Sequence, residues 1–205
     1  FYERAGKVRL KNGKIASVTI GGTVSPAGGN FEEPVTQATL KVVGAFHGLS
    51  RERSDARKYP AIHPIDSWSK YRGVVDRALV EQARAILKRS NEINQMKKVI
   101  GEEGTSAEDY IVYQKGELLD AVYLQQNSFD PIDAACDPDR QVYEFNVLYD
   151  VLTRDFTLAD KKEIRAFFNQ VRQEFLDWHN TVFRSPEFEA QEKRLKDFYL
   201  SKTVG

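Results

Sequence analysis

The hydrophobic residues of this chain follow both strand and helix patterns in its first third and a helical period in the rest. Residues 15–20 alternate apolar and small or polar side chains, which is typical of a β-strand. Residues 8–10 are also β-prone, and the Asn12-Gly13 pair between the two runs predicts a hairpin. An apolar helical pattern then occupies residues 34–47, with Pro34 near its start.

From Asp66 onward the pattern predicts helices almost throughout. Three sets of apolar residues recur at helical spacing. They are Val75, Leu79, Ala83, Ile86, Leu87 and Ile93; then Ile111, Leu118, Leu119, Val122 and Tyr123; and then Ile164, Phe167, Phe168, Val171 and Phe175. The pattern is interrupted at residues 101–105, 127–138, 156–157 and 185–186. We therefore expect a bundle of about five helices that begins between residues 66 and 74.

The stretch before the bundle is charged and then rich in proline. Residues 50–58 carry many charges and predict a loop or a short helix. Residues 59–64 read Tyr-Pro-Ala-Ile-His-Pro, and the two prolines favour an extended, exposed segment over a helix. The expected fold is therefore mainly α, with a strand–helix part followed by a helical bundle.

Composition narrows the classes of partner. The chain has 205 residues, of which 41% are hydrophobic and 29% charged, enough for one sizeable core or two small ones. Thirty Lys and Arg residues balance thirty Asp and Glu, so no global field draws the chain to nucleic acid. No apolar run approaches the roughly 20 residues that span a bilayer. We therefore expect neither nucleic-acid binding nor direct membrane insertion.

The residues that usually hold metals are few. Cys136 is the single cysteine, which excludes an internal disulfide and a cysteine-rich zinc site and fits a reducing compartment. His47, His63 and His179 are far apart along the chain and lack the spacing of metal ligands. No metal site is predicted.

Motifs for nucleotide hydrolysis and for nucleophilic catalysis are also missing. The sequence contains no Gly-x-Ser-x-Gly elbow and no His-Glu-x-x-His helix. The Gly21-Gly22 and Gly28-Gly29 pairs lack the lysine and hydroxyl that a phosphate loop uses to hold phosphate and magnesium. We therefore expect no catalytic residue in this stretch of chain.

Residues 25–36 carry the first resemblance to a known family. They read Ser-Pro-Ala-Gly-Gly-Asn-Phe-Glu-Glu-Pro-Val-Thr, between the predicted strand and the predicted helix. This sequence resembles a segment of the catalytic A subunit of the rotary V-type and A-type ATPases, in which the segment faces the central shaft. The resemblance implies that Asn30, Glu32 and Glu33 contact the rotor, through solvated polar contacts that cost little to make and release. The other interpretation is helix capping by Asn30, with the two glutamates favouring the helix dipole.

Two aromatic residues carry the second resemblance. In the family, an aromatic-Pro-Ala segment packs against the adenine of the bound nucleotide, and Tyr59 in Tyr-Pro-Ala matches it, although V-type subunits usually have Phe there. Residues 124–130, Leu-Gln-Gln-Asn-Ser-Phe-Asp, resemble the block that supplies a second aromatic wall, so Phe129 is implied at that position. Ala135 or Cys136 are further candidates for the lining. The alternatives are a turn residue for Tyr59 and a buried loop anchor for Phe129.

An acidic turn at residues 101–109 is the third point of resemblance. It occupies the place of the acidic helix-turn-helix that pushes on the central stalk in this superfamily, which implies rotor contacts for Glu102 and Glu103. The same stretch is also a plain helix start, because Thr105 or Ser106 is followed by Glu108 and Asp109.

The resemblance implies that the chain contains parts of two domains of a larger subunit. Residues 1–66 would be the C-terminal part of an α/β RecA-like nucleotide-binding domain, and residues 67–205 the C-terminal helical domain. Because the chain starts at Phe1, we expect it to be an excerpt whose phosphate loop, with ATP or ADP and magnesium, lies upstream. The excerpt alone is expected to be inactive and to bind no nucleotide tightly, since phosphate contacts supply most of such a site's electrostatics.

The implied parent is an ion-translocating ATPase or ATP synthase, which couples ATP hydrolysis or synthesis to proton or sodium transport. Its expected partners are the non-catalytic B subunit and the central stalk subunits. Its expected place is the cytoplasmic ATPase head, peripheral to the membrane. The competing hypothesis is a free-standing helical module that binds a protein partner and no nucleotide.

Overall fold

The computed structural model describes residues 1–203 and divides the chain into two compact units. The first unit is Phe1–His47 together with Ser67–Tyr71. The second is Gly48–Asp66 together with the described residues from Arg72 onward. Each unit is described separately below.

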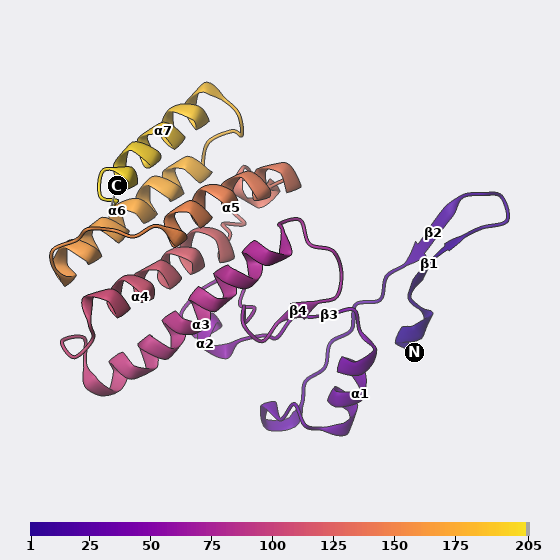
Figure 1. The fold of residues 1–205 in the computed structure, drawn as a ribbon. Helices are drawn as coiled ribbons and strands as arrows, with labels where there is room; N and C mark the ends of the chain where they lie inside the picture. Colours follow the sequence, from indigo (N-terminus) through magenta and orange to yellow (C-terminus); the bar gives the residue numbers. More distant parts are fainter. Residues whose placement is uncertain (204–205) are drawn as a thin grey trace. The chain divides into compact units, whose positions relative to one another are not determined.

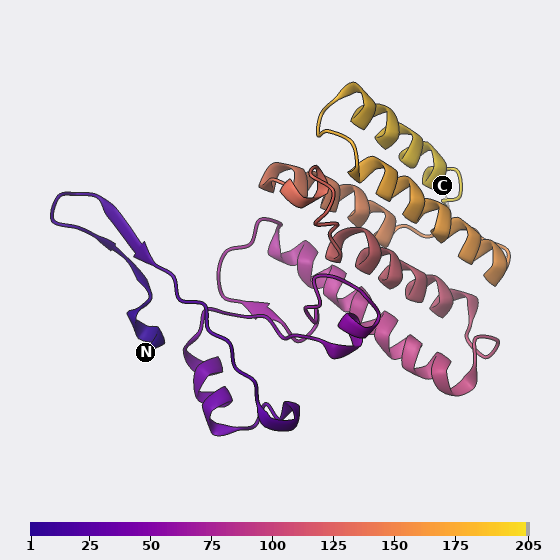
Figure 2. The ribbon, with the colours of Figure 1, turned by 180° about the vertical axis from the view of Figure 1, so that it is seen from behind.

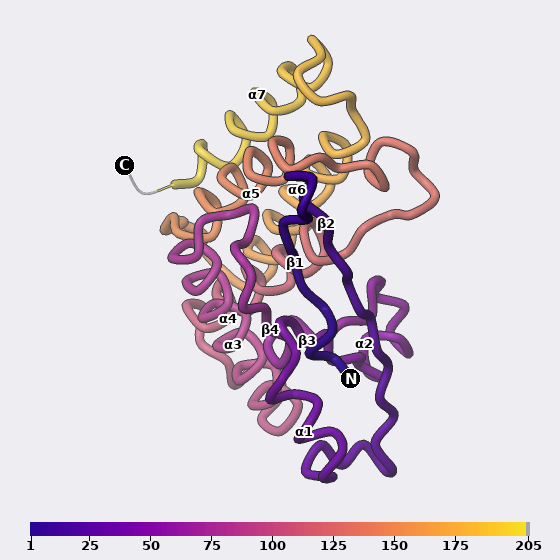
Figure 3. The backbone as a smooth tube through the Cα atoms, turned by 90° about the vertical axis from the view of Figure 1, so that its right-hand side faces the viewer, coloured from indigo at the N-terminus to yellow at the C-terminus, as the bar shows by residue number. Residues whose placement is uncertain are grey.

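The first unit begins with the predicted hairpin. After a short 3-10 turn at Tyr2–Arg4, β1 (Gly6–Arg9) pairs in antiparallel fashion with β2 (Ile15–Val18), as Figure 3 shows. Gly13 in the turn has a φ of 83°, which favours glycine, and the Asn12 side chain accepts from the Lys14 amide at 3.0 Å. The hairpin prediction is confirmed.

The helix that follows is shorter than the sequence pattern predicts. A 3-10 turn, η2 (Ala27–Gly29), leads into α1, which spans Pro34–Val42 and not residues 34–47. Residues beyond it form β3 (Ala45–Phe46), which pairs with β4 (Trp68–Ser69). The prediction of the helix end was wrong because strand pairing with residues more than twenty positions away overrides the local helical pattern.

The second unit opens with a predicted short helix. α2 (Arg51–Asp55) has an N-cap, Ser50, that accepts from the Arg53 amide at 3.2 Å. After it the chain bends at residues 59–60, and Leu49 and Ile62 form an isolated antiparallel bridge. The prediction of an extended, exposed segment over residues 59–64 was wrong, because the Ile62 amide bonds back to the Pro60 carbonyl oxygen and residues 61–64 are partly buried.

Five long helices follow, as expected. Their bounds are α3 Arg77–Ile100, α4 Ala107–Leu119, α5 Pro138–Thr153, α6 Lys161–His179 and α7 Pro186–Leu200. A π-helical turn, η3 (Asp120–Leu124), continues α4, and a 3-10 turn, η4 (Asp133–Ala135), lies in the next loop. Helix starts at Arg77 rather than Asp66, because residues 68–69 pair as a strand and Asp76 caps the first long helix. None of the described helices is both long and apolar enough to cross a bilayer.

Each of the long helices begins after a polar cap, and helices that are not consecutive in sequence also pack together. The N-cap side chains that accept a backbone N–H are Asp76, Ser106, Asp137, Asp160 and Ser185. α4 packs against α3 on one side and α6 on another, and α7 packs against α6. Figure 1 shows this layered order and Figure 2 shows it from behind.

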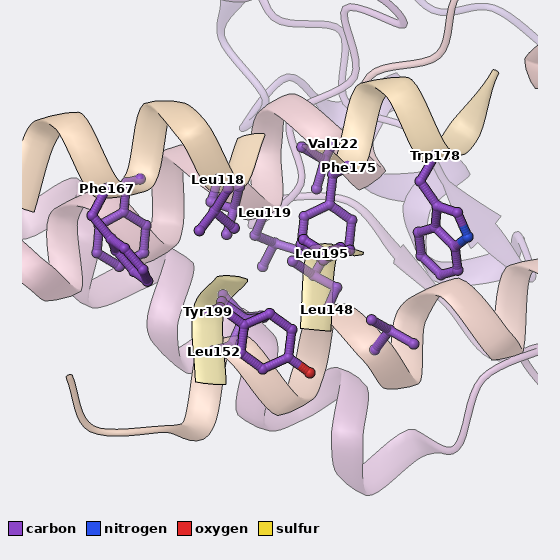
Figure 4. Packing of buried hydrophobic residues seen from close by; sticks show 14 of the residues in the cluster. Leu118, Leu119, Val122, Leu148, Leu152, Phe167, Phe175, Trp178, Leu195 and Tyr199 are labelled. Carbon is purple, nitrogen blue, oxygen red and sulfur yellow. The ribbon is translucent and has the colours of Figure 1, made fainter. Parts of the chain in front are cut away.

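The core of the second unit lies between α4, α5, α6 and α7. Figure 4 shows Leu148 and Leu152 of α5 beside Phe175 of α6 and Leu195 of α7. All four side chains are at most 2% exposed. Trp178 is fully buried, and its ring centroid lies 4.8 Å from that of Phe188. The apolar period that predicted the helices therefore also identifies the faces that build this core.

A buried polar cluster joins α5 to the end of α6. Arg140 Nε donates to Glu144 at 2.6 Å, and its Nη2 donates to the His179 carbonyl oxygen at 2.5 Å. His179 Nε2 lies 3.7 Å from Glu144. Burial and the nearby Arg140 lower the pKa of His179 to about 4, so this contact is not an ion pair at neutral pH. Burial raises the pKa of Glu144 to about 6, although Arg140 opposes the shift.

The cluster predicts a specific pH dependence of stability. His179 has an ordinary pKa of 6.5 and a folded value of about 4, so the unfolded chain binds more protons between these pH values. The free energy of unfolding should therefore fall as the pH drops through this window, by about 3 kcal/mol more than in His179→Gln. Urea denaturation of both proteins at several pH values measures the difference.

The opposite titration of Glu144 cancels in that comparison. Its folded pKa of about 6 exceeds the ordinary 4.5, so its contribution to stability grows as the pH falls through that range. This contribution is present in both proteins. Parallel stability curves for the two proteins between pH 6.5 and 4 would contradict the assignment of a neutral, buried His179.

Candidate functional site

Tyr59 lies in a bend that follows α2. It is 53% exposed. The preceding helix is held by Arg53, whose side chain is buried, and Lys58 directly precedes Tyr59 in the sequence. The backbone after Tyr59 is tied down by the bridge between Leu49 and Ile62. A half-exposed aromatic ring is therefore presented from an anchored segment.

Phe129 lies at the tip of the loop between η3 and α5. Its ring is 96% exposed, so it is not the buried loop anchor that was the alternative interpretation. The loop around it is organised by side chains that accept backbone amides. Asn127 Oδ1 accepts from the Phe129 amide at 3.1 Å, and Asp130 Oδ1 accepts from Ile132 and Asp133. These bonds order the backbone of the loop that carries the exposed ring.

The structure brings these two segments together. The Gln126 backbone N–H donates to the Tyr59 carbonyl oxygen at 3.1 Å, although the two residues are far apart in the sequence. Both segments belong to the second unit. The contact thus joins Tyr59 to a residue three positions before Phe129.

The two further lining candidates behave differently. Ala135 is exposed, whereas Cys136 is half-buried, with its Sγ 4.0 Å from Glu144. Burial and the neighbouring Glu144 raise the pKa of the Cys136 thiol to about 11. The thiol is therefore neutral at physiological pH and acts as a small apolar group.

A buried ionic network that the sequence did not predict lies under the Tyr59 segment. Asp120, at the start of η3, accepts from Arg53 Nη1 and from Lys58 Nζ, both at 2.6 Å. Its side chain is 8% exposed. The one available signal was an aspartate inside the apolar run Leu118–Val122, because a carboxylate in such a run needs a partner.

An open cavity of about 280 Å³ adjoins this network in the second unit. Residues of α2, α3 and α4 line it, including Arg53, Asn94, Glu117 and Asp120. Its lining includes two cations, Arg53 and Lys58, and three carboxylates, those of Glu52, Glu117 and Asp120. The carboxylates outnumber the cations, so the cavity does not select for an anion.

The segment predicted to contact a rotor belongs to the first unit. Asn30 and Glu32 are exposed, and Asn30 Oδ1 accepts from the Glu32 amide at 3.0 Å. Glu33 is the N-cap residue of α1, and its carboxylate accepts from the Thr36 hydroxyl at 2.9 Å. Asn30 therefore braces its own loop rather than capping α1, and Glu33 is partly engaged at the helix start.

The acidic turn between α3 and α4 is tied to α6. Glu102 is half-buried and pairs with Arg165 and, at 3.9 Å, with Lys97. Lys161 Nζ donates to the carbonyl oxygens of Glu102 and Glu103 at 2.6 and 3.0 Å. Glu103 itself is exposed. The turn thus presents one exposed carboxylate on a braced backbone.

No group of three or more His, Cys, Asp or Glu residues arranged to hold a metal occurs in residues 1–203. His63 Nδ1 accepts from the Asp66 amide at 3.2 Å, which gives that histidine a local role.

Comparison with known proteins identifies two family segments. Residues 1–69 match the nucleotide-binding domain of the ATP synthase alpha/beta family, and residues 77–168 match the C-terminal domain of V and A type ATP synthase. The chain is 61% identical over 204 residues to the V-type ATP synthase alpha chain of Borrelia turicatae. It is 59% identical to that of Borreliella burgdorferi strain B31.

These relatives are much longer than this chain. The matches cover 100% of the chain but only 35% of the Borrelia turicatae protein and 36% of the Borreliella burgdorferi protein. Among solved structures, an ATP synthase subunit, NeqB, from Nanoarcheaum equitans has a similar fold, with a TM-score of 0.59 and 18% identity. That match covers 74% of this chain and 38% of the other.

Identity is thus high along the whole chain, and both matched segments come from the same kind of subunit in the same order. The match does not favour the alternative of a free-standing interaction module. Over its full length the chain is thus similar to V-type ATP synthase alpha chains, and it spans about a third of the length of these relatives.

Proposed function

We propose that this chain is part of the catalytic alpha subunit of a rotary ATPase or ATP synthase, in which Tyr59 and Phe129 form two walls of the adenine pocket. The observation that carries this proposal is the backbone contact between the two ring-bearing segments. The Gln126 amide donates to Tyr59 O, Phe129 follows three residues after Gln126, and both aromatic residues are exposed. An exposed aromatic ring offers a flat π face on which a purine can stack.

The rest of the nucleotide would be held by other residues of the full-length subunit. This chain contains no phosphate loop, and its described residues form no metal cluster, so ATP phosphates and magnesium would bind elsewhere in the parent. The neighbouring B subunit would contribute an arginine to the same site. The 205-residue chain alone would neither hydrolyse ATP nor bind it tightly.

The helical bundle would convert nucleotide binding into movement. Closure of the two rings around adenine would draw the bundle toward the nucleotide and press the Glu102–Glu103 turn on the central stalk. Asn30, Glu32 and Glu33 would touch the same shaft from the nucleotide-binding part. The parent complex would couple this cycle to proton or sodium transport, with the alpha subunit in the cytoplasmic head, peripheral to the membrane.

The double variant Tyr59→Ala with Phe129→Ala in the assembled complex tests the proposal. Loss of both rings should raise the KM for ATP about tenfold to a hundredfold, because base–aromatic stacking contributes roughly 1–3 kcal/mol. Steady-state ATP hydrolysis by the purified complex measures the effect.

Tyr59→Phe with Phe129→Tyr is the matched control, since it keeps both ring faces. This variant should keep a KM within about threefold of the wild type. An unchanged KM in the double alanine variant would show that the rings do not contact the nucleotide.

A further inference from the structure

Asp120 is bonded to both of the segments that carry the exposed rings. Its carboxylate accepts from two cations of residues 53–58, the stretch that directly precedes Tyr59. Its backbone carbonyl accepts from Gln125 Nε2 at 3.3 Å, and the next residue, Gln126, makes the backbone bond to Tyr59. One residue is thus linked to the Tyr59 segment through its side chain and to the Phe129 segment through its main chain.

The geometry of this network is strongly constrained by burial. The Asp120 and Arg53 side chains are only 8% and 10% exposed. A buried ion pair that loses one partner leaves an uncompensated charge, so the pair resists displacement. Glu117 Oε2, 3.7 Å from Lys58 Nζ, supplies a second negative charge. The charges hold the end of the 53–58 stretch against the end of α4.

The position of Asp120 in the backbone adds a second constraint. It is the first residue of the π-helical turn η3, where α4 ends. A π turn changes the helical register, and such turns are frequent at functional sites. The register at Asp120 sets the point at which the chain leaves the bundle toward the Phe129 loop.

We propose that Asp120 is a positioning residue that sets the placement of Tyr59 relative to the Phe129 loop and thereby tunes the affinity of the complex for adenine nucleotide. This inference rests on the proposed function, because it needs the two rings to contact adenine. Asp120 is buried beneath the ring-bearing segments and acts through Tyr59 rather than on the nucleotide.

A double-mutant cycle in the assembled complex tests the inference. The variants are Asp120→Asn, Tyr59→Leu and their combination, each assayed for KM and kcat of ATP hydrolysis. Asp120→Asn should raise KM about fivefold to twentyfold and leave kcat within about twofold. In the Tyr59→Leu background the same substitution should change KM by less than about twofold, because the ring through which it acts is gone. Asp177→Asn, which alters a hydrogen-bonded aspartate of α6, is the matched control and should leave KM unchanged.

Lys58→Met provides a second arm if the Asp120→Asn complex does not assemble. It removes one of the two cations at a partly exposed position, and it should raise KM about threefold, again only when Tyr59 is present. Equal increases in both backgrounds, or no increase from either variant, would overturn the positioning role. A Tyr59→Leu complex with unchanged KM would instead overturn the adenine pocket itself.

Discussion

Trp178→Ala lowers the free energy of unfolding of this chain by about 3–5 kcal/mol, the range for truncating a large buried aromatic residue. The Trp178 side chain is fully buried, and its ring packs against those of Tyr143, Phe175 and Phe188. Because these residues come from α5, α6 and α7, the surroundings cannot collapse into the space without moving whole helices. Urea denaturation followed by far-UV circular dichroism measures the loss.

Trp178→Phe is the informative control for that prediction. The indole Nε1 is buried and has no hydrogen-bond partner among the described residues, so phenylalanine removes a group that gains nothing from burial. We expect this variant to lose less than about 1.5 kcal/mol. A Trp178→Ala protein as stable as Trp178→Phe would mean that the α5–α6–α7 core is loosely packed.

Glu144→Met should cost a similar 3–5 kcal/mol, for an electrostatic reason. The Arg140 and Glu144 side chains are 5% and 7% exposed, and their ion pair is 2.6 Å long. Without Glu144 the guanidinium stays buried and charged, because arginine does not release its proton in proteins. Denaturation of the wild type and the variant at pH 7 measures the loss.

The combined variant Arg140→Met with Glu144→Met should recover most of that stability, since no unpaired charge is then buried. Glu92→Gln breaks an ion pair with Arg89 in which both side chains are 51% exposed, so it should leave the free energy of unfolding nearly unchanged. A double variant no more stable than Glu144→Met alone would contradict the electrostatic explanation.

Local signals account for most of what the sequence predicted correctly about the fold. The Asn12-Gly13 turn fixes the hairpin, and side-chain caps such as Ser106 and Ser185 mark where long helices begin. Each of these signals acts over three or four residues and needs no knowledge of the rest of the chain. The end of α1 was mispredicted because Ala45 and Phe46 pair with Ser69 and Trp68, which no local pattern shows.

In the candidate site, too, some residues could be predicted from the sequence and others could not. Tyr59 and Phe129 were identified from their resemblance to sequence motifs of the family. The structure adds that both residues are exposed and that their segments share a hydrogen bond. Their contact with adenine stays a prediction. Asp120 was missed because its partners Arg53 and Lys58 lie 67 and 62 positions away, beyond any periodic signal. Buried ionic contacts of this kind depend on which helices meet, and that is decided by the fold.

The bracing of the acidic turn by α6 has a practical consequence for spectroscopy. Lys161 binds two carbonyl oxygens of the turn, and Arg165 pairs with Glu102. A fluorophore attached at position 103 should therefore have little nanosecond backbone motion of its own. Its anisotropy decay would report the rotational motion of the helical bundle. A label at this position could therefore follow changes in the orientation of the bundle during turnover.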